Sequence, residues 1–167
     1  MATITRQGVQ LRRTDDGAPP QKYDLPEKAA QTWGAGNFIT VDANGFVELQ
    51  SGADQATFWG IALNAGQNLA ANGDKRCEVI RLDPTMVFIG TVTTGAGNTD
   101  YVLLAGDVYG TMGLNYDATT KRFYLDASEQ GTADDRVTVL GLAPGSAVGD
   151  TNAQVYFKFL ASSIQNY

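Results

Sequence analysis

Hydrophobic and polar residues alternate with a period of two along much of the chain after residue 36. Within residues 36–63, two alternating runs flank Asn44-Gly45, a dipeptide that favours a type I′ turn between antiparallel strands. Further strand-like runs occupy residues 57–63, 76–82, 85–92 and 101–106. In the run at 154–160, Val155, Phe157 and Phe159 share one face. The pattern predicts a mainly β protein.

The order of motifs in residues 36–63 recurs in residues 106–143. The matched positions are Ala35-Gly36-Asn37 with Ala105-Gly106-Asp107, Asp42-Ala43 with Asp117-Ala118, Leu49 with Leu125, Gly60-Ile61-Ala62 with Gly141-Leu142-Ala143, and Val79 with Val155. Accidental similarity within a glycine-rich β protein is one interpretation, and structural duplication is the other. We expect duplication, with repeats at about 35–82 and 105–160 that pack into a compact β-barrel or β-sandwich because neither buries its apolar face alone.

Residues 1–32 differ from the body that follows. They carry five basic and four acidic side chains, a net charge of +1, so the remainder carries −7. Asp16-Gly17 and Pro19-Pro20 interrupt regular structure. We expect an extended N-terminal arm here, followed by a β-barrel domain at 33–167. An ordered first strand with a surface loop is the alternative.

The amino-acid composition excludes several classes of function. The chain has 167 residues and a net charge of −6, and only 18% of its residues are charged. An acidic surface argues against nucleic acid as a partner, since phosphate contacts rely on Lys and Arg. The longest apolar run, near residues 86–92, is too short for a membrane-spanning helix. Because Cys77 is the only cysteine and no signal peptide is visible, we expect synthesis in a reducing cytoplasm.

Candidate chemistry is sparse. The chain has no histidine, which removes Ser-His and Cys-His nucleophiles and most zinc and iron sites. Cys77 fits buried packing better than reactivity. Asp134 and Asp135 are adjacent in a loop and are expected to be solvated. We therefore predict no catalytic residue, metal or cofactor, and a hydrolase that uses two distant carboxylates stays a minor alternative.

Residues 36–63 and 77–90, including the run LDPTMVFIG, resemble tailed-phage capsid decoration proteins, also called head cement proteins, of the small β-barrel type with an N-terminal arm. The resemblance implies a structural virion protein with no invariant catalytic residue. It would bind outside the phage head and stabilise contacts between capsomers of an HK97-type major capsid protein. It also implies self-association, as a homotrimer or alternatively a dimer, and a location on the outer surface of the capsid.

Interface residues are expected in the arm and among exposed aromatics. An extended arm can add a strand to a neighbour's sheet, and aromatic side chains often anchor interfaces. The residues assigned to contacts are Ile4, Val9, Leu11, Arg12, Arg13, Trp33 and Tyr167, while core packing is favoured for Trp59. The alternative function is a glycan- or ligand-binding β module of a phage head or tail fibre, in which aromatic and acidic groups contact sugars.

Overall fold

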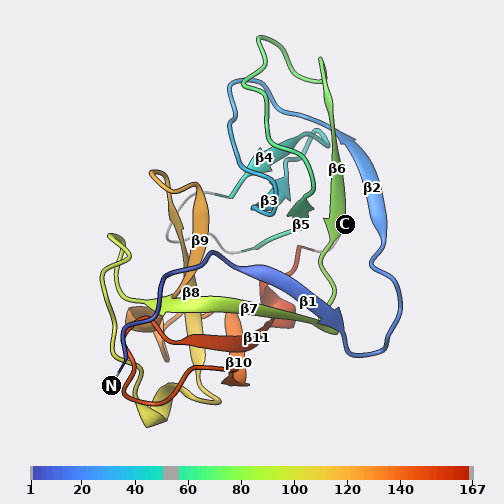
Figure 1. The fold of residues 1–167 in the computed structure, drawn as a ribbon. Helices are drawn as coiled ribbons and strands as arrows, with labels where there is room; N and C mark the ends of the chain where they lie inside the picture. The colour runs from blue at the N-terminus through green and yellow to red at the C-terminus, as the bar shows by residue number, and fades with distance from the viewer. Residues whose placement is uncertain (1, 51–56, 166–167) are drawn as a thin grey trace.

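The computed structural model describes residues 2–50 and 57–165, and its regular elements are strands and three short 3₁₀ helices (Figure 1). The mainly β class is therefore confirmed. The strands are β1 (Gln10–Thr14), β2 (Lys22–Pro26), β3 (Phe38–Val41), β4 (Val47–Leu49), β5 (Gly60–Ala62), β6 (Arg76–Arg81), β7 (Met86–Thr93), β8 (Thr111–Asp117), β9 (Arg122–Asp126), β10 (Val137–Leu142) and β11 (Gln154–Phe159). The 3₁₀ helices are η1 (Ala105–Asp107), η2 (Ala127–Glu129) and η3 (Ala161–Ser163).

Two five-stranded units follow one another and share a strand order. The first unit, residues 22–81, has the order β2-β6-β5-β3-β4, and the second unit, residues 86–159, has the order β7-β11-β10-β8-β9. Counted within each unit, both orders are first, fifth, fourth, second, third, and all these neighbours are antiparallel. The repeat that the motifs indicate thus extends to topology and includes β2 and β7, which precede the matched residues.

The second unit is a closed barrel. Its first and third strands, β7 and β9, meet in parallel through Val92 opposite Leu125 and Thr93 opposite Asp126. In the first unit, Glu27, the residue after β2, forms a single parallel bridge with Val47 of β4. Closure therefore removes the open strand edges of the second unit, whereas the first unit is a five-stranded sheet whose ends meet only at this bridge.

Matched residues lie at equivalent corners of the two units. The Asn37 side chain accepts a hydrogen bond from the Gly34 N–H (2.9 Å), and the Asp107 side chain accepts one from the Leu104 N–H (2.7 Å). In each case the acceptor lies three residues after the donor and just before a hairpin. Asp42 and Asp117 likewise each accept two backbone N–H groups in their hairpin turns. Equivalent positions therefore use the same local chemistry.

The β3–β4 hairpin is confirmed, but its predicted turn type is wrong. Gly45 has a φ of 84°, whereas Asn44 is not in the left-handed region that a type I′ turn requires. The Asp42 N–H bonds to the Phe46 carbonyl at 3.0 Å, and the Gly45 N–H bonds to the Asp42 carbonyl at 2.9 Å. This is a three-residue loop with a glycine bulge. The Asp42 carboxylate favours it by accepting the N–H groups of Asn44 and Phe46.

Two other strand predictions had different outcomes. β11 alternates as expected, with Val155, Phe157 and Phe159 buried. Residues 101–106, predicted as a strand, form only an isolated bridge at Val102 and then enter η1. Their continuous apolar run belongs instead to a loop that packs Leu103 inward and leaves Val102 and Leu104 exposed.

The main core lies inside the second unit and extends into the first. Phe38 on β3 is at its centre, and its ring centroid lies 4.9–5.7 Å from four other phenylalanine rings, those of Phe58, Phe88, Phe123 and Phe159. A second cluster fills the first unit and includes Trp33, Ile39 and Cys77. Because side chains alternate along a strand, β3 sends Phe38 to one cluster and Ile39 to the other. The two units therefore share packing across β3.

Residues 1–32 contribute strands to both sheets. β1 pairs with β7 of the second unit, and β2 pairs with β6 of the first. Before β1, the Ala2 N–H bonds to the Asp150 carboxylate (2.7 Å) and the Ile4 N–H bonds to the Thr151 carbonyl (3.0 Å). In this chain the segment predicted as an arm lies against its own body, which matches the alternative of an ordered first strand.

The backbone crosses between the units three times. Residues 15–21 lead from β1 to β2, and residues 82–85 lead from β6 back to β7. These two connections line one cavity of about 450 Å³, so they run close together. The last crossing follows β11, where the Phe58 N–H of the first unit bonds to the Ser163 carbonyl (2.8 Å) and the Gln165 N–H bonds to the Phe58 carbonyl (2.8 Å). In Figure 1 the first unit lies above and the second below, with β1 along β7.

Candidate interaction surfaces

The predicted interface residues of the N-terminal segment lie on the second unit. Val9 and Leu11 are half-buried and pack against the main core. Ile4 is half-buried beside Thr151, and Arg12 and Arg13 are exposed, with Arg13 3.3 Å from Asp15. The apolar members of this group thus already have contacts within the chain, and the two arginines face solvent.

The expected exposure of Trp33 is wrong. Its side chain is only 2% exposed, and its indole N–H donates to the Asn64 carbonyl at 2.9 Å. Gly66 lies directly on the ring, where a Cβ would come within 2.5 Å of an indole carbon. Trp59 is also buried, as favoured from the sequence, and Tyr167 lies outside the described residues.

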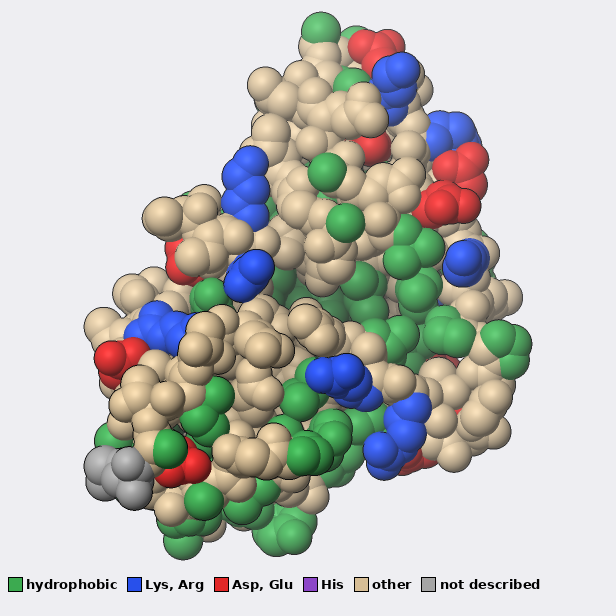
Figure 2. All heavy atoms as spheres, viewed as in Figure 1, with side chains coloured by type: hydrophobic (Ala, Val, Ile, Leu, Met, Phe, Trp, Pro, Cys, Tyr) green, Lys and Arg blue, Asp and Glu red, His purple; other side chains and the backbone are tan. Residues whose placement is uncertain are grey.

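An exposed apolar surface occupies one end of the second unit, and we call it the apolar end surface. It consists of Val102, Leu104, Tyr109, Leu140, Leu142 and Val148. Backbone hydrogen bonds bring their three segments together. The Gly149 N–H bonds to the Leu103 carbonyl (2.8 Å), and the Val139 N–H bonds to the Gly110 carbonyl (2.8 Å). Figure 2 shows hydrophobic side chains along the lower edge of the molecule, over this unit.

Tyr109 is the most exposed member of the apolar end surface. Its residue is 75% exposed, and its backbone has a φ of 70°, a region that residues other than glycine and asparagine rarely adopt. Because its ring is exposed, Tyr109 does not stabilise the fold by burial, and its backbone conformation costs free energy. A residue with this combination is a candidate for contact with a partner. The exposure of Tyr109 was not predicted from the sequence, because Val108-Tyr109-Gly110 resembles the end of a strand, where a tyrosine is often buried.

Asp107 holds the loop that carries Tyr109. Its buried carboxylate accepts the Leu104 N–H (2.7 Å) and the Tyr101 hydroxyl (3.0 Å). Burial, together with this hydrogen bond to Asp107, raises the pKa of Tyr101 to about 12. The hydroxyl therefore stays protonated and keeps donating at physiological pH. The apolar end surface is displayed on a fixed loop.

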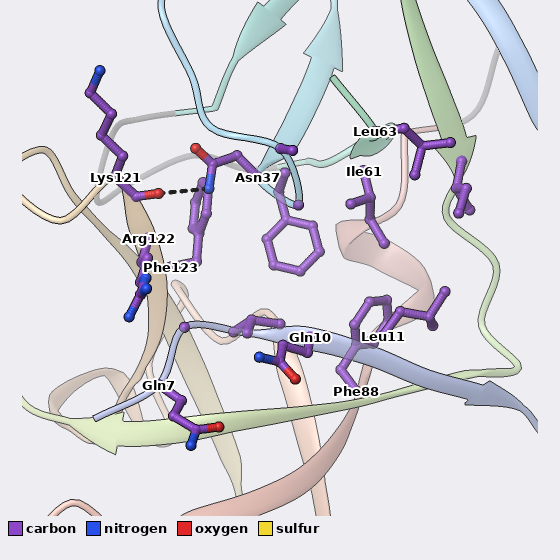
Figure 3. A pocket seen from close by; sticks show the side chains of 16 residues that line it. Gln7, Gln10, Leu11, Asn37, Ile61, Leu63, Phe88, Lys121, Arg122 and Phe123 are labelled. Atoms are coloured by element: carbon purple, nitrogen blue, oxygen red, sulfur yellow. Dashed lines mark hydrogen bonds between the residues drawn. The ribbon is translucent and has the colours of Figure 1, made fainter. Parts of the chain in front are cut away.

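A groove of about 670 Å³ separates the two units (Figure 3). Residues 7–11 form one side, while residues 35–38, 61–63 and Ile80 of the first unit form the other. The hairpin end at residues 121–123 closes one end. Asn37 joins the units there, since its amide donates to the Lys121 carbonyl at 2.9 Å.

Comparison with known proteins does not place the chain in a family. The chain matches no protein-family model and no curated protein.

Cys77 lacks the properties of a nucleophile. It is fully buried in the first unit, and burial raises the pKa of its thiol to about 11. A thiolate is the reactive form, so the side chain is protonated and unreactive at neutral pH. Burial of Cys77 agrees with the packing role expected from the sequence.

The paired carboxylates Asp134 and Asp135 hold a turn and are half-buried, so the expectation that they are solvated is wrong. Asp134 lies 2.8 Å from the Arg136 guanidinium, and Asp135 accepts hydrogen bonds from the Thr111 hydroxyl and the Gly131 N–H. Within residues 2–50 and 57–165, no group of three or more Cys, Asp or Glu side chains is placed to hold a metal ion. No helix in the same ranges is long and apolar enough to cross a membrane.

Proposed function

We propose that this chain is a structural virion protein of a tailed phage, a capsid decoration or cement protein. It binds outside the head and stabilises contacts between capsomers of the major capsid protein. The observation that carries the proposal is the apolar end surface, because large exposed apolar patches mark protein contacts. The resemblance of residues 36–63 and 77–90 to this class supports the identity of the partner.

A compact protein of two packed β units is suited to the role of a capsid decoration protein. A decoration protein acts in many copies on a repeated surface, and multivalent attachment turns modest contacts into strong retention. We expect self-association as a homotrimer, with a dimer as the alternative, and a location on the outer capsid surface after synthesis in the host cytoplasm. The proposed function needs no catalysis, cofactor, metal, nucleic acid or membrane.

Co-sedimentation with expanded heads that lack the protein tests the proposal. We expect saturation at a copy number set by icosahedral symmetry. Leu104→Asp places a charge in the exposed apolar end surface and should lower affinity at least tenfold, which corresponds to about 1.4 kcal/mol. Lys22→Ser, an exposed change on β2, is the matched control. If the protein does not bind heads, or L104D binds like the unchanged chain, the proposal is overturned.

The groove favours a second function, a glycan- or ligand-binding module of a phage head or tail fibre. The exposed amide side chains of Gln7 and Gln10 line it and make no hydrogen bond to any residue that the structure describes. Planar amides commonly bind hydroxyl-rich ligands. A glycan array separates the two functions, because a cement protein shows no saccharide preference.

A further inference from the structure

The groove contains an open strand edge. β1 is the last strand of its sheet and pairs only with β7. At Val9 the chain still bonds to β9, through its N–H and the Phe123 carbonyl (3.1 Å). Beyond Val9 the strands diverge, and within the described ranges no backbone hydrogen bond joins residues 10–14 to β3, β5 or β6. Gln10 and Leu11 line the groove on this side.

The walls of the groove are apolar and one end is cationic. Leu11, Leu63 and Ile80 line it as half-buried side chains. At the end near β9, Arg122 is exposed and makes no ion pair or side-chain hydrogen bond with any described residue. Figure 3 shows Arg122 at the hairpin end of the groove, and Gln7 and Gln10 along the N-terminal segment that leads into β1. Figure 2 shows hydrophobic side chains along the hollow between the two units.

We propose that this groove binds an extended polypeptide segment of a partner protein, which pairs with the open edge of β1 and places an acidic side chain against Arg122. An open edge offers main-chain donors and acceptors to an added strand, and apolar walls accept its alternate side chains. The site is separate from the apolar end surface and does not depend on the capsid role.

The local charge of the groove favours an acidic segment. The chain as a whole carries a net charge of −6 and repels acidic groups, so the attraction has to come from a cation in the groove. Arg122 is an unpaired guanidinium that can hold a carboxylate in bidentate geometry, with Gln7 and Gln10 as further donors. A peptide fits better than an oligosaccharide, because only a peptide repeats donors and acceptors at the spacing of a strand edge.

Peptide titration into the isolated protein tests the site. The probes are acetylated, amidated heptapeptides of alternating Thr and Val with Glu, Gln or Lys at the centre, added to ¹⁵N-labelled protein. We expect chemical-shift changes centred on residues 7–11 and 121–123, and binding of the Glu peptide at least about threefold tighter than that of the Lys peptide. Shift changes confined to the apolar end surface, or no preference among the three peptides, overturn the proposal.

A variant pair tests the charge. Arg122→Glu should reverse the preference from the Glu peptide to the Lys peptide. Arg12→Glu makes the same charge change on β1 outside the groove and should leave the preference unchanged. Equal effects of the two variants would mean that only net charge matters and would overturn the site.

N-methylation of the Glu peptide tests strand addition. Methyl groups on alternate amides block one edge of the peptide while its side chains stay the same. We expect one alternate set to weaken binding at least tenfold and the other set to have little effect. If neither set weakens binding, or if maltohexaose shifts the same groove signals while the peptides shift none, the groove is not a strand acceptor. Because no phage heads are used, failure of this assay is distinct from failure of head binding.

Discussion

Phe38 lies where the two units meet, and its ring contacts the rings of four other phenylalanines. It is only 1% exposed. Phe38→Ala should lower the free energy of unfolding by about 3–5 kcal/mol, because it leaves a cavity in a closely packed core. Phe46→Ala, the same change at a half-buried turn position, should cost about 1 kcal/mol. Urea denaturation measures both, and similar losses would contradict a central role for Phe38.

Tyr109 combines exposure with a left-handed backbone conformation. Asparagine tolerates this conformation better than tyrosine, so Tyr109→Asn should raise the free energy of unfolding by about 0.5–1 kcal/mol. If the ring contacts the capsid, the same variant should bind heads more weakly. Tyr109→Phe keeps the ring and should change neither quantity. A variant Y109N that is less stable than the unchanged chain would contradict the strain.

Two carboxylates bind the residues before β1. The Asp150 carboxylate accepts the Ala2 N–H, which lowers the pKa of Asp150. The Asn152 amide and then Arg6, whose guanidinium lies 2.7 Å away, lower the pKa of Asp100. Both folded pKa values are thus below the ordinary 3.8. The contribution of these groups to stability is complete above that value and disappears as the pH falls through the folded pKa.

Acid should therefore release the first residues before the barrel unfolds. We expect the amide signals of Ile4 and Val9 to move toward random-coil positions below pH 3.8, ahead of those of Phe88. Asp150→Ala removes one acceptor and should release Ile4 already at pH 7. Asp16→Asn, which lies outside this contact, is the control. Release of all three amides in one step would show that the segment is not a separate unit.

At the scale of elements, hairpins and repeats were predictable because their signals are local. The Asp42 and Asp117 turns and the Gly60 position follow from residues within a few positions of each other. A Cβ at Gly60 would lie 2.5 Å from the Val79 side chain, which is the close packing that a glycine within a strand indicates. The run at 101–106 was wrongly predicted as a strand, because a short apolar run indicates burial but does not show whether a partner strand lies beside it.

Burial by distant residues was not predictable. Trp33 is covered by Gly66 and bonded to Asn64, more than thirty residues away. Docking of residues 2–9 depends on Asp150 and Thr151, at the other end of the chain. The unpaired side of β1 and the exposed ring of Tyr109 are likewise consequences of how whole units meet. The candidate surfaces therefore emerged only from the structure, whereas the repeat was visible in the sequence.

At the scale of the molecule, the shared core predicts cooperative unfolding. The main cluster contains residues of both units, and β1 and β2 tie the N-terminal segment to each. We expect one thermal transition with equal calorimetric and van't Hoff enthalpies. Two transitions in the unchanged protein would show that the units unfold independently. If Phe38 couples the two units, F38A should lower the ratio of the van't Hoff enthalpy to the calorimetric enthalpy below one while the fold is retained.

The three backbone crossings, at 15–21, 82–85 and 160–165, constrain how the units can move. The first two run close together and contain Pro19, Pro20 and Pro84, which limit backbone rotation. The shared core around Phe38 and the hydrogen bond from Asn37 to Lys121 hold the units together on their other sides. The groove lies between the same two units, so its width is fixed before any ligand enters. An extended ligand gains from this, because a preformed site costs less ordering entropy on binding.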